Sequence, residues 1–543
     1  MNSFRPSRIW DGFACLAIAA AAFILWNPPL GARTGMIYVS PTGADWSSGA
    51  SREQSVRTIQ RAADMARPGD RIVILPGTYF ERVHVQRGGT QDNPVTFEAA
   101  EPGTVIISGA LPESVPSDWH WKSEGDGIWS TATSRPVYAL SANGEALFRV
   151  PWGGVKWLRD LVMRPTAWGA FYYENHRLFV FLRGGAHPAE CGLVAHAEVP
   201  EPREWGEFKS ANVWLEADHV VLTGLRLEIG IGAGILVWNA EDVSIRDCAF
   251  QGATFGVKCS CGVKPARRVT VENCFYHNFP QYFWHRDWLT WSECYAAYSS
   301  SSLIGAADDG TRVANNLVTH GGDALRISTH DSTIEEGVDI SGNWLAYCTD
   351  DAVEFDGHAK HVHFHDNVVF ECHEVISASP VLSGPVLVDN NLFLHPSGGM
   401  NGAQIKIISE ERFPGSAEMQ PIRNVEISDN AAFGNWLCWS SRGPVENIQI
   451  HDNVFCVARQ TDPPWPAKVT ASHNVISMVS TPAVNVSEMI RQIQAAAAHD
   501  APLADMVRRN RQLLNSRPGP SWLNWEECHA THGLPKLAES RKP

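Results

Sequence analysis

The chain has 543 residues and a formal net charge of −15, with 59 acidic side chains against 44 basic ones. Proteins that bind nucleic acid present a basic face, so this composition argues against a nucleic-acid partner. The 12 cysteines are spaced irregularly, which excludes a small disulfide-stapled domain, and the length suits either several ordinary domains or one long repeat.

The first residues predict export. Arg5 and Arg8 precede an apolar run over residues 13–26, which is too short to span a bilayer comfortably but is typical of a signal peptide. We expect residues 1–32 to be a signal peptide cut after Ala32, with an uncleaved anchor as the alternative. Cleavage leaves a periplasmic or secreted protein with no stable membrane span.

Residues 33–114 are predicted to form an N-terminal cap and the first coils of a solenoid. The segment 55–66 is amphipathic, and such a helix can plug the open end of a stack of strands. The turn, strand and turn over residues 68–79, with the short strand 37–40 before them, resemble the opening of many pectate-lyase-like β-helix proteins. Residues 115–210 interrupt the pattern and are rich in aromatic side chains, so we expect an inserted β-rich subdomain there.

Residues 211–481 carry the repeat that predicts the fold. An alternating apolar strand followed by Asp or Asn and then Asn recurs every 21–27 residues, with two longer spacings of 42 and 39 that indicate insertions. The asparagines that share this offset are Asn316, Asn343, Asn367, Asn391, Asn430, Asn453 and Asn474. Asparagines stacked inside at the ~4.8 Å strand spacing can bond to one another as a ladder. The sequence therefore predicts a right-handed parallel β-helix of ten or more coils.

After the repeat ends, residues 482–543 are predicted to form a C-terminal helical cap, with helices over 487–498 and 503–514 closing the other end. Cysteines also recur in register, as Cys248 with Cys274 and Cys348 with Cys372. Such pairs could lie near disulfide distance, but small buried thiols are the interpretation that we favour.

Chemistry on a β-helix must sit on its outer face or in its loops, because side chains fill the interior. Aligning the coils on a second strand produces two columns. One column contains Phe255, Asp323, Asp351, Glu374 and Ala403, and an outward one contains Lys258, Arg326, Glu354, Ser377 and Lys406. Carboxylates stacked about 5 Å apart raise one another's pKa, which separates acid from base roles. A calcium site or a plain acidic surface are the alternatives.

The segment 349–355, Thr-Asp-Asp-Ala-Val-Glu-Phe, resembles the paired-aspartate turn of polygalacturonase-type β-helix glycoside hydrolases. Asp351 with Glu374 one coil later resembles the retaining β-helix glycosidases of the xylosidase kind, which implies an aspartate nucleophile and a glutamate acid/base. The Gly-His-Gly and Arg-Ile-Lys signatures of polygalacturonases are missing. Adjacent coils suit a retaining pair, whereas Asp323 with Glu374 could form an inverting one. We predict Asp351 as nucleophile, Glu374 as acid/base, and Asp323 as a pKa modulator or hydroxyl ligand.

A polysaccharide lyase or uronate epimerase is the alternative enzyme. Its base and cationic groups would come from Lys258, Arg326, Lys406 and His320. Calcium held by Asp350, Asp351 and Glu354 could replace the cationic group, so no cofactor is required but calcium is possible. A non-catalytic polysaccharide-binding protein would need no stacked acids.

The insertion over residues 281–310 is rich in aromatic side chains, and Trp284, Trp288 and Trp291 could stack on sugar rings beside Asp350 and Glu354. We expect a polysaccharide or oligosaccharide substrate and a monomeric protein. His361, His363 and His365 all point outward from one strand, where a solvated face is favoured over zinc, so no metal site is predicted.

Overall fold

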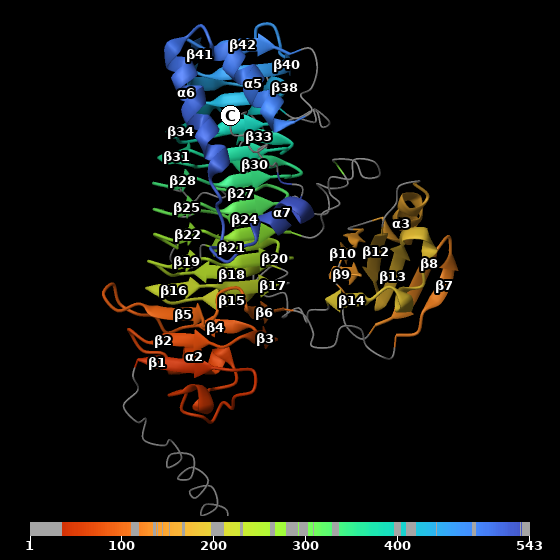
Figure 1. Cartoon of the computed structure of the whole chain (residues 1–543). Coiled ribbons are helices and arrows are strands. Elements are labelled where there is room, and N and C mark those ends of the chain that lie inside the picture. The colour runs from red at the N-terminus through yellow and green to blue at the C-terminus, as the bar shows by residue number, and fades with distance from the viewer. Residues whose placement is uncertain are drawn as a thin grey trace, which may run out of the picture.

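A computed structural model of the chain describes most of residues 35–534 (Figure 1). The residues outside the description are 1–34, 110–118, 134–136, 138, 144, 151–152, 165–168, 197–210, 229–231, 261–265, 279–291, 293–301, 308, 328–335, 396–402, 409–419, 441–442, 480–484, 533 and 535–543. The predicted signal peptide and Trp284, Trp288 and Trp291 therefore lie outside the described residues. None of the helices within the described ranges is long and apolar enough to cross a membrane.

The main body is a right-handed parallel β-helix, as predicted, in which each coil contributes strands to three stacks (Figure 1). The first stack is a 13-stranded parallel sheet. Its strands are β1 (Met36–Val39), β2 (Arg71–Ile74), β5 (Val95–Ala99), β16 (Val220–Thr223), β19 (Ser244–Arg246), β22 (Thr270–Glu272), β25 (Arg312–Ala314), β28 (Asp339–Ser341), β31 (Val362–His365), β34 (Val386–Asp389), β37 (Ile422–Ser428), β39 (Val445–His451) and β41 (Val469–Ser472).

The second stack follows the asparagine turn in each coil. It runs through β3 (Gly77–Tyr79), β6 (Val105–Ser108), β17 (Leu225–Glu228), β20 (Ala249–Gln251), β23 (Phe275–His277), β26 (Leu317–Thr319), β29 (Trp344–Ala346), β32 (Val368–Phe370), β35 (Leu392–Leu394), β38 (Ala431–Ser440), β40 (Val454–Arg459) and β42 (Val475–Met478).

The third stack carries the predicted acid column. It runs through β4 (Val83–Val85), β15 (Ala211–Leu215), β18 (Ala233–Trp238), β21 (Phe255–Ser260), β24 (Ser302–Gly305), β27 (Leu325–Arg326), β30 (Asp351–Glu354), β33 (Glu374–Ala378) and β36 (Ala403–Ile407), and the end of β38 pairs with β36.

The asparagine ladder is confirmed. Asn343, Asn367 and Asn391 are fully buried. The side-chain oxygen of Asn367 accepts from both the backbone N–H and the side-chain amide of Asn343, each at 2.9 Å, and the same bonds link Asn367 to Asn391. Each rung pairs the polar groups of a buried turn, which would otherwise be left unsatisfied at a cost of about 1–3 kcal/mol each.

The residue before the ladder asparagine explains the Asp/Asn preference at that position. Asp366 and Asn390 have φ values of +56° in the left-handed region. Asn, Asp and Gly adopt this conformation more readily than other residues. The doublet in the repeat therefore combines one residue that turns the chain with one that bonds the coils together.

Helix α2 (Ile59–Met65) packs at the N-terminal end of the solenoid, where Ile59, Ala62 and Ala63 join the core. It begins at Ile59, later than the predicted Ser55, because Thr58 caps it by accepting from the N–H of Arg61. A short 3-10 helix, η1 (Arg52–Gln54), precedes it.

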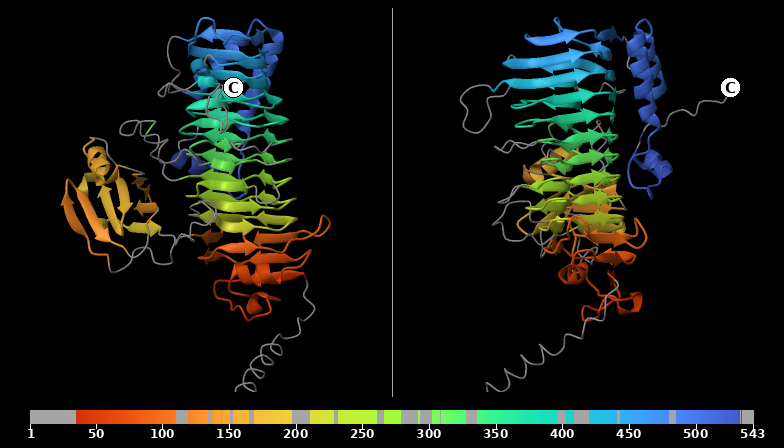
Figure 2. Two further views of the ribbon diagram at one scale, coloured as in Figure 1. Left: turned by 180° about the vertical axis from the view of Figure 1, so that it is seen from behind. Right: turned by 90° about the vertical axis from the view of Figure 1, so that its left-hand side faces the viewer.

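The C-terminal helices lie along the flank of the solenoid and do not close its end, which corrects the predicted cap over 482–543 (Figure 2, right). These helices are α5 (Val486–Ala497), α6 (Ala501–Gln512), η7 (Leu513–Asn515) and α7 (Trp525–His532). Their apolar side chains pack on Leu317, Trp344, Val368 and Leu392 of the second stack. Asn510 of α6 is fully buried and donates to the backbone oxygens of Asn391 and Asp429.

The inserted β-rich subdomain is observed, with its own apolar clusters (Figure 1). It contains a five-stranded sheet of β7 (Lys122–Gly125), β8 (Ile128–Ala132), β11 (Phe148–Arg149), β12 (Gly169–Glu174) and β13 (Arg177–Leu182). A second sheet is formed by β9 (Ala139–Ala142), β10 (Glu145–Ala146) and β14 (Leu193–His196), and the helices are α3 (Gly154–Val162), η2 (Arg183–Gly185) and η3 (Pro188–Glu190).

The paired cysteines are buried thiols, as favoured from the sequence. Cys248, Cys274, Cys348 and Cys372 are free and at most 1 % exposed. Burial raises the pKa of the Cys274 thiol well above its ordinary value, helped by a hydrogen bond with Cys248. Both thiols also donate to backbone carbonyls. They therefore fill the core as small apolar side chains.

Candidate active site

The acid column is brought together on three consecutive coils. Asp351 of β30 is the register partner of Glu374 of β33. Leu325 of β27 pairs with Val353, which places Asp323 one coil before Asp351, and the backbone N–H of Asp351 donates to Asp323 Oδ1 at 3.2 Å. The three carboxyl groups predicted to carry the chemistry are therefore neighbours.

A break in strand alternation explains why the two columns share one face. Ala352 and Val353 are consecutive residues, and both belong to the buried core. In a regular strand, successive side chains point to opposite sides, so two inward residues in a row leave Asp351 and Glu354 on the same outer side. The irregularity turns two separate columns into one polar cluster.

Two cations lie inside this cluster. The Lys406 ammonium of β36 is 3.2 Å from Asp351 Oδ2 and 3.3 Å from Glu374 Oε2. The Arg326 guanidinium of β27 is 2.6 Å from Glu354 Oε2 and 3.6 Å from Asp323 Oδ2. Both residues were predicted as substrate-binding cations, and here each of them neutralises part of the acid column.

The carboxyl groups are nearly inaccessible to water, and this sets their protonation. Glu374 is 1 % exposed, and burial together with the Asp351 charge raises its pKa to about 9. Asp351 is 2 % exposed, and burial raises its pKa too, but the Lys406 charge opposes that rise. Near neutral pH, Glu374 is accordingly the member of the pair that holds a proton, and it can donate that proton to Asp351.

Open acceptor positions remain on this pair. Asp351 Oδ1 and Glu374 Oε1 accept no hydrogen bond from any residue that the structure describes. Buried polar atoms without partners are uncommon in folded proteins and are often found where a ligand or a reacting group binds. These buried oxygens are therefore free to accept a hydrogen bond that no described residue supplies.

Asp356 is a further member of the site that the sequence analysis missed. It follows β30, is 6 % exposed, and accepts hydrogen bonds from the Ser379 N–H at 2.7 Å and the Ser377 hydroxyl at 3.2 Å. Burial and the Glu354 charge raise the pKa of Asp356 well above its ordinary value. Its position before Gly357 was consistent with an ordinary turn, so its burial gave no signal in the sequence.

Trp436 was missed as well. Its register partner is Ala403, which places Trp436 in the same column as Asp351 and Glu374, two coils beyond Glu374. Two strand spacings amount to roughly 9.6 Å along the solenoid. The tryptophan is partly exposed, and its indole N–H has no hydrogen-bond partner among the described residues.

Three of the carboxylates could also hold a cation. Oxygen atoms of Asp323, Asp350 and Asp351 all lie within 4.8 Å of one another. Hard cations such as calcium take carboxylate oxygens at 2.3–2.6 Å, so the donor set fits calcium better than a transition metal. Glu354, which the sequence suggested as a calcium ligand, is instead paired with Arg326.

The other predicted residues lie elsewhere. One coil lies between the coils of Lys258 and Arg326, and Gly305 in that coil is the register partner of both residues. The Lys258 ammonium lies 4.8 Å from the Phe255 ring centroid. His320 is 4 % exposed and stacks on Tyr347 at 5.2 Å.

Comparison with known proteins places the acid column within a matched region. A family model described as the right-handed beta helix region matches residues 213–393, which include Asp323, Asp351 and Glu374. Over 73 residues, the chain is 40 % identical to the uncharacterized protein YwoF of Bacillus subtilis (strain 168). That alignment covers 13 % of this chain and 15 % of the length of the relative.

Solved structures with similar folds include both hydrolases and lyases. XylC in complex with xylose is 13 % identical, with a TM-score of 0.43, over 81 % of this chain and 86 % of that one. A GH136 lacto-N-biosidase from Eubacterium ramulus is 13 % identical, with a TM-score of 0.42, over 82 % of this chain and 68 % of the biosidase chain. Pectate lyase Pel9A is 12 % identical, with a TM-score of 0.41, over 83 % and 82 %.

Proposed function

We propose that this chain is a retaining glycoside hydrolase, with Asp351 as nucleophile and Glu374 as acid/base. The observation that carries the proposal is the pair itself: two buried carboxyl groups in register on adjacent coils, with the Lys406 ammonium within 3.3 Å of both and the pKa of Glu374 raised to about 9. Retaining glycosidases use carboxyl groups about 5–5.5 Å apart, and adjacent strands are about 4.8 Å apart.

Each residue has a defined step in this mechanism. Glu374 gives its proton to the leaving glycosidic oxygen while Asp351 attacks the anomeric carbon and forms a covalent glycosyl ester. Glu374, now a carboxylate, then takes a proton from water, and that water displaces Asp351. Lys406 supports the first step because its charge opposes the rise that burial causes in the pKa of Asp351 and so favours the ionised nucleophile.

The charge of the site favours a neutral sugar. Six carboxyl groups surround two cations, Arg326 and Lys406, in this cluster. The carboxyl groups belong to Asp323, Asp350, Asp351, Glu354, Asp356 and Glu374. Because Arg326 and Lys406 are both paired with carboxyl groups, neither cation is free to neutralise the carboxylates of a uronic acid polymer. Trp436, roughly 9.6 Å along the column, provides an aromatic surface at a distance of about two sugar rings.

Product analysis tests the proposal directly. The full chain should release reducing sugar from neutral oligosaccharides, with the first-formed anomer keeping the configuration of the substrate. Asp351→Asn and Glu374→Gln should each reduce kcat by orders of magnitude, and an activated aryl glycoside should restore much of the activity of Glu374→Gln only. Glu336→Gln, an exposed acid paired with Lys360, is the matched control. Near-normal activity in both site variants would refute the mechanism.

A calcium-dependent lyase is a second candidate, favoured by the close oxygens of Asp323, Asp350 and Asp351. In that reaction a base removes the proton next to a uronate carboxylate, the glycosidic oxygen leaves, and a carbon–carbon double bond forms. Asp351 and Glu374 raise the pKa of Lys406, so Lys406 could act as base only after a cation had taken Asp351. Ultraviolet-absorbing products that disappear with a chelator would establish this candidate in place of the hydrolase.

A further inference from the structure

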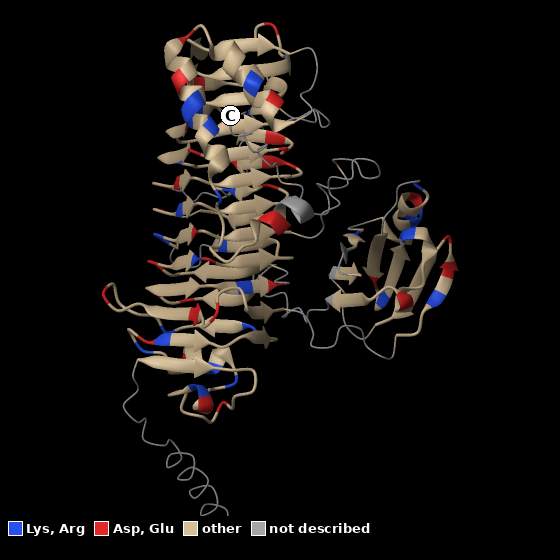
Figure 3. Ribbon diagram, viewed as in Figure 1, with Lys and Arg blue, Asp and Glu red and all other residues tan. Residues whose placement is uncertain are grey.

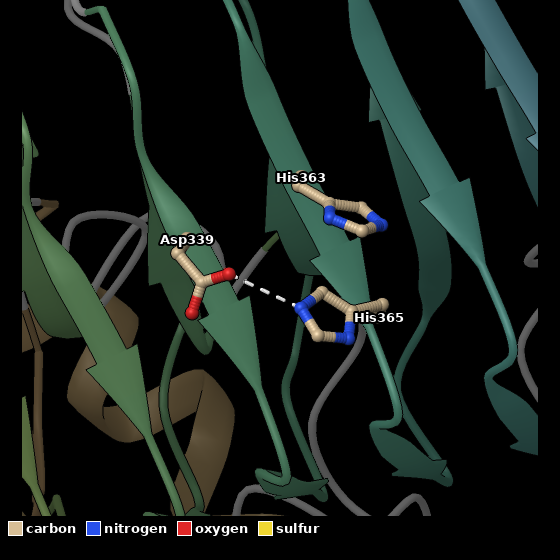
Figure 4. A group of neighbouring side chains, drawn as sticks. All are labelled: Asp339, His363 and His365. Carbon is tan, nitrogen blue, oxygen red and sulfur yellow. Dashed lines mark hydrogen bonds and ion pairs between the residues drawn. The ribbon is translucent and has the colours of Figure 1, made fainter.

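A second cluster of side chains lies on the first stack (Figure 4), whereas the acid pair lies on the third stack. His363 and His365 of β31 alternate with the buried Val362 and Phe364, so both imidazoles point outward. Their rings are stacked with centroids 4.0 Å apart. Two outward imidazoles in contact on one strand are a pair of nitrogen donors that neighbouring coils can complement.

Carboxylates on both neighbouring coils complete the cluster. Asp339 of β28 and Asp389 of β34 are the register partners of His363 and His365, respectively. The contacts run diagonally: His365 Nε2 is 3.1 Å from Asp339 Oδ2, and His363 Nε2 is 2.5 Å from Asp389 Oδ2. From the sequence we favoured a solvated face here, because three histidines of one strand rarely converge on a tetrahedral ion by themselves.

We propose that His363, His365 and Asp339, with Asp389 beside them, form a binding site for a zinc ion. Ligand atoms of the first three residues all lie within 4.8 Å of one another. In a tetrahedral site with bonds of 2.0–2.1 Å the ligand atoms are about 3.4 Å apart, so small side-chain rotations suffice. Two imidazoles and a carboxylate suit zinc better than calcium or magnesium, which prefer oxygen alone.

The surroundings of His365 support this assignment. Its Nδ1 atom is 2.7 Å from Asp366 Oδ2, and Asp366 in turn accepts from the side-chain amide of Asn390. Histidines that bind a metal commonly donate their other ring N–H to a carboxylate, which fixes the ring and raises its basicity. Zinc would replace the proton shared by His365 Nε2 and Asp339, and that proton would leave to solvent.

The site is open to solvent and bridges three coils. The side chains of His363 and Asp339 are 39 % and 43 % exposed, so a metal ion can enter without rearrangement of the core. Arg312 Nε lies 3.8 Å from Asp339 Oδ1, and this weak pair would have to yield to the metal. Because the ligands come from β28 and β31 and Asp389 of β34 lies beside them, binding should stabilise the stack and leave turnover at the acid pair unchanged.

Calorimetric titration of the full chain with zinc chloride tests the site. The titration is run in zinc-free buffer with excess calcium, which competes for oxygen-only sites such as the acid column. We expect one zinc ion whose affinity falls at least ~100-fold in His365→Ala, and ~10- to 100-fold in Asp366→Asn, where only the outer carboxylate is lost. His361→Ala is the matched control, because His361 is exposed beside the same strand but pairs with Glu336.

Asp339→Asn supplies an independent check because it preserves size while removing one ligand charge. It should weaken zinc binding and abolish the zinc-dependent rise in melting temperature, with an unchanged circular dichroism spectrum. Absence of zinc binding by the full chain would overturn the proposal. Equal zinc affinity in the His365→Ala, Asp339→Asn and parent proteins would overturn it as well, since zinc would then bind elsewhere.

Discussion

Replacing Glu374 with glutamine should stabilise the protein while abolishing its proposed activity. Glu374 is 1 % exposed and its pKa is raised from 4.5 to about 9, mainly by burial and by the charge of Asp351. At pH 7 the folded chain therefore carries a proton on Glu374 that the unfolded chain has lost. Folding must take up this proton, and glutamine removes that requirement.

The size of the effect follows from the shift. A group whose pKa is raised on folding reduces stability as pH rises from its unfolded pKa to its folded pKa. The free energy of unfolding falls by about 1.4 kcal/mol for each pH unit in this range, so Glu374 reduces it by about 3 kcal/mol between pH 4.5 and pH 7. At pH 9 the upper bound is about 6 kcal/mol, whereas below pH 4.5 the variant and the parent protein should differ little.

Urea unfolding at pH 4.5, 7 and 9, monitored by tryptophan fluorescence, measures this difference. The free energy of unfolding of Glu374→Gln should exceed that of the parent by an amount that grows with pH. Glu336→Gln, on an exposed acid, should show no such trend. Parallel pH dependences for Glu374→Gln and the parent protein would refute the assignment of Glu374 as the buried, protonated acid.

Two further predictions concern Lys406 and the asparagine ladder. Lys406→Met removes the charge that lowers the pKa of Asp351, so the acidic limb of the kcat/KM profile should move to higher pH, while Lys360→Met leaves the profile in place. Asn367→Ala leaves the buried backbone N–H of Asn343 without its acceptor and removes one of the bonds of the Asn343 side-chain amide, which should cost about 2–4 kcal/mol in urea unfolding. Asn474→Ala, at the partly exposed last rung, should cost only about 1 kcal/mol; equal losses at both rungs would contradict the ladder argument.

The solenoid could be predicted because its signal repeats. Seven coils present an inward asparagine after a residue with positive φ, and together these seven copies reveal the period of the repeat. The position of the C-terminal helices could not be predicted in the same way. The apolar face of α5 indicates that the helix is buried, but not whether it packs on the end or on the flank of the stack, because each surface is apolar.

The acid column was predicted from spacing alone, but the assembly of the site was not. Strand periodicity identifies Asp351 and Glu374 as neighbours, whereas the two inward residues Ala352 and Val353 break that periodicity and bring Lys406 to the pair. The coil that contains β24 was missed in the alignment of the coils. Gly305 is the register partner of Lys258 and Arg326 there, and it has no side chain that would indicate the column. Asp356 and Trp436 depend on tertiary burial and register, which a motif does not encode.

Charge on the solenoid is arranged in two contrasting ways. Figure 3 shows acidic and basic positions interspersed on the face that is drawn, without a continuous basic stripe among the described residues. On the first stack, cross-coil pairs such as Arg268 with Asp242 at 2.7 Å satisfy the charges locally. In the acid column, by contrast, carboxyl groups exceed cations and are hidden from water, an arrangement that opposes folding.

The asparagine ladder explains how the fold tolerates this opposition. The coils that carry Asp323, Asp351 and Glu374 are the ones joined by Asn316, Asn343, Asn367 and Asn391, each fully buried and bonded to the next. Bonds in the interior hold the strand spacing fixed, so repulsion on the outer wall cannot push the carboxyl groups apart. Burial and this repulsion together raise the pKa of Glu374 instead. A protonated carboxyl group beside an ionised one is what acid-assisted displacement at a sugar carbon requires.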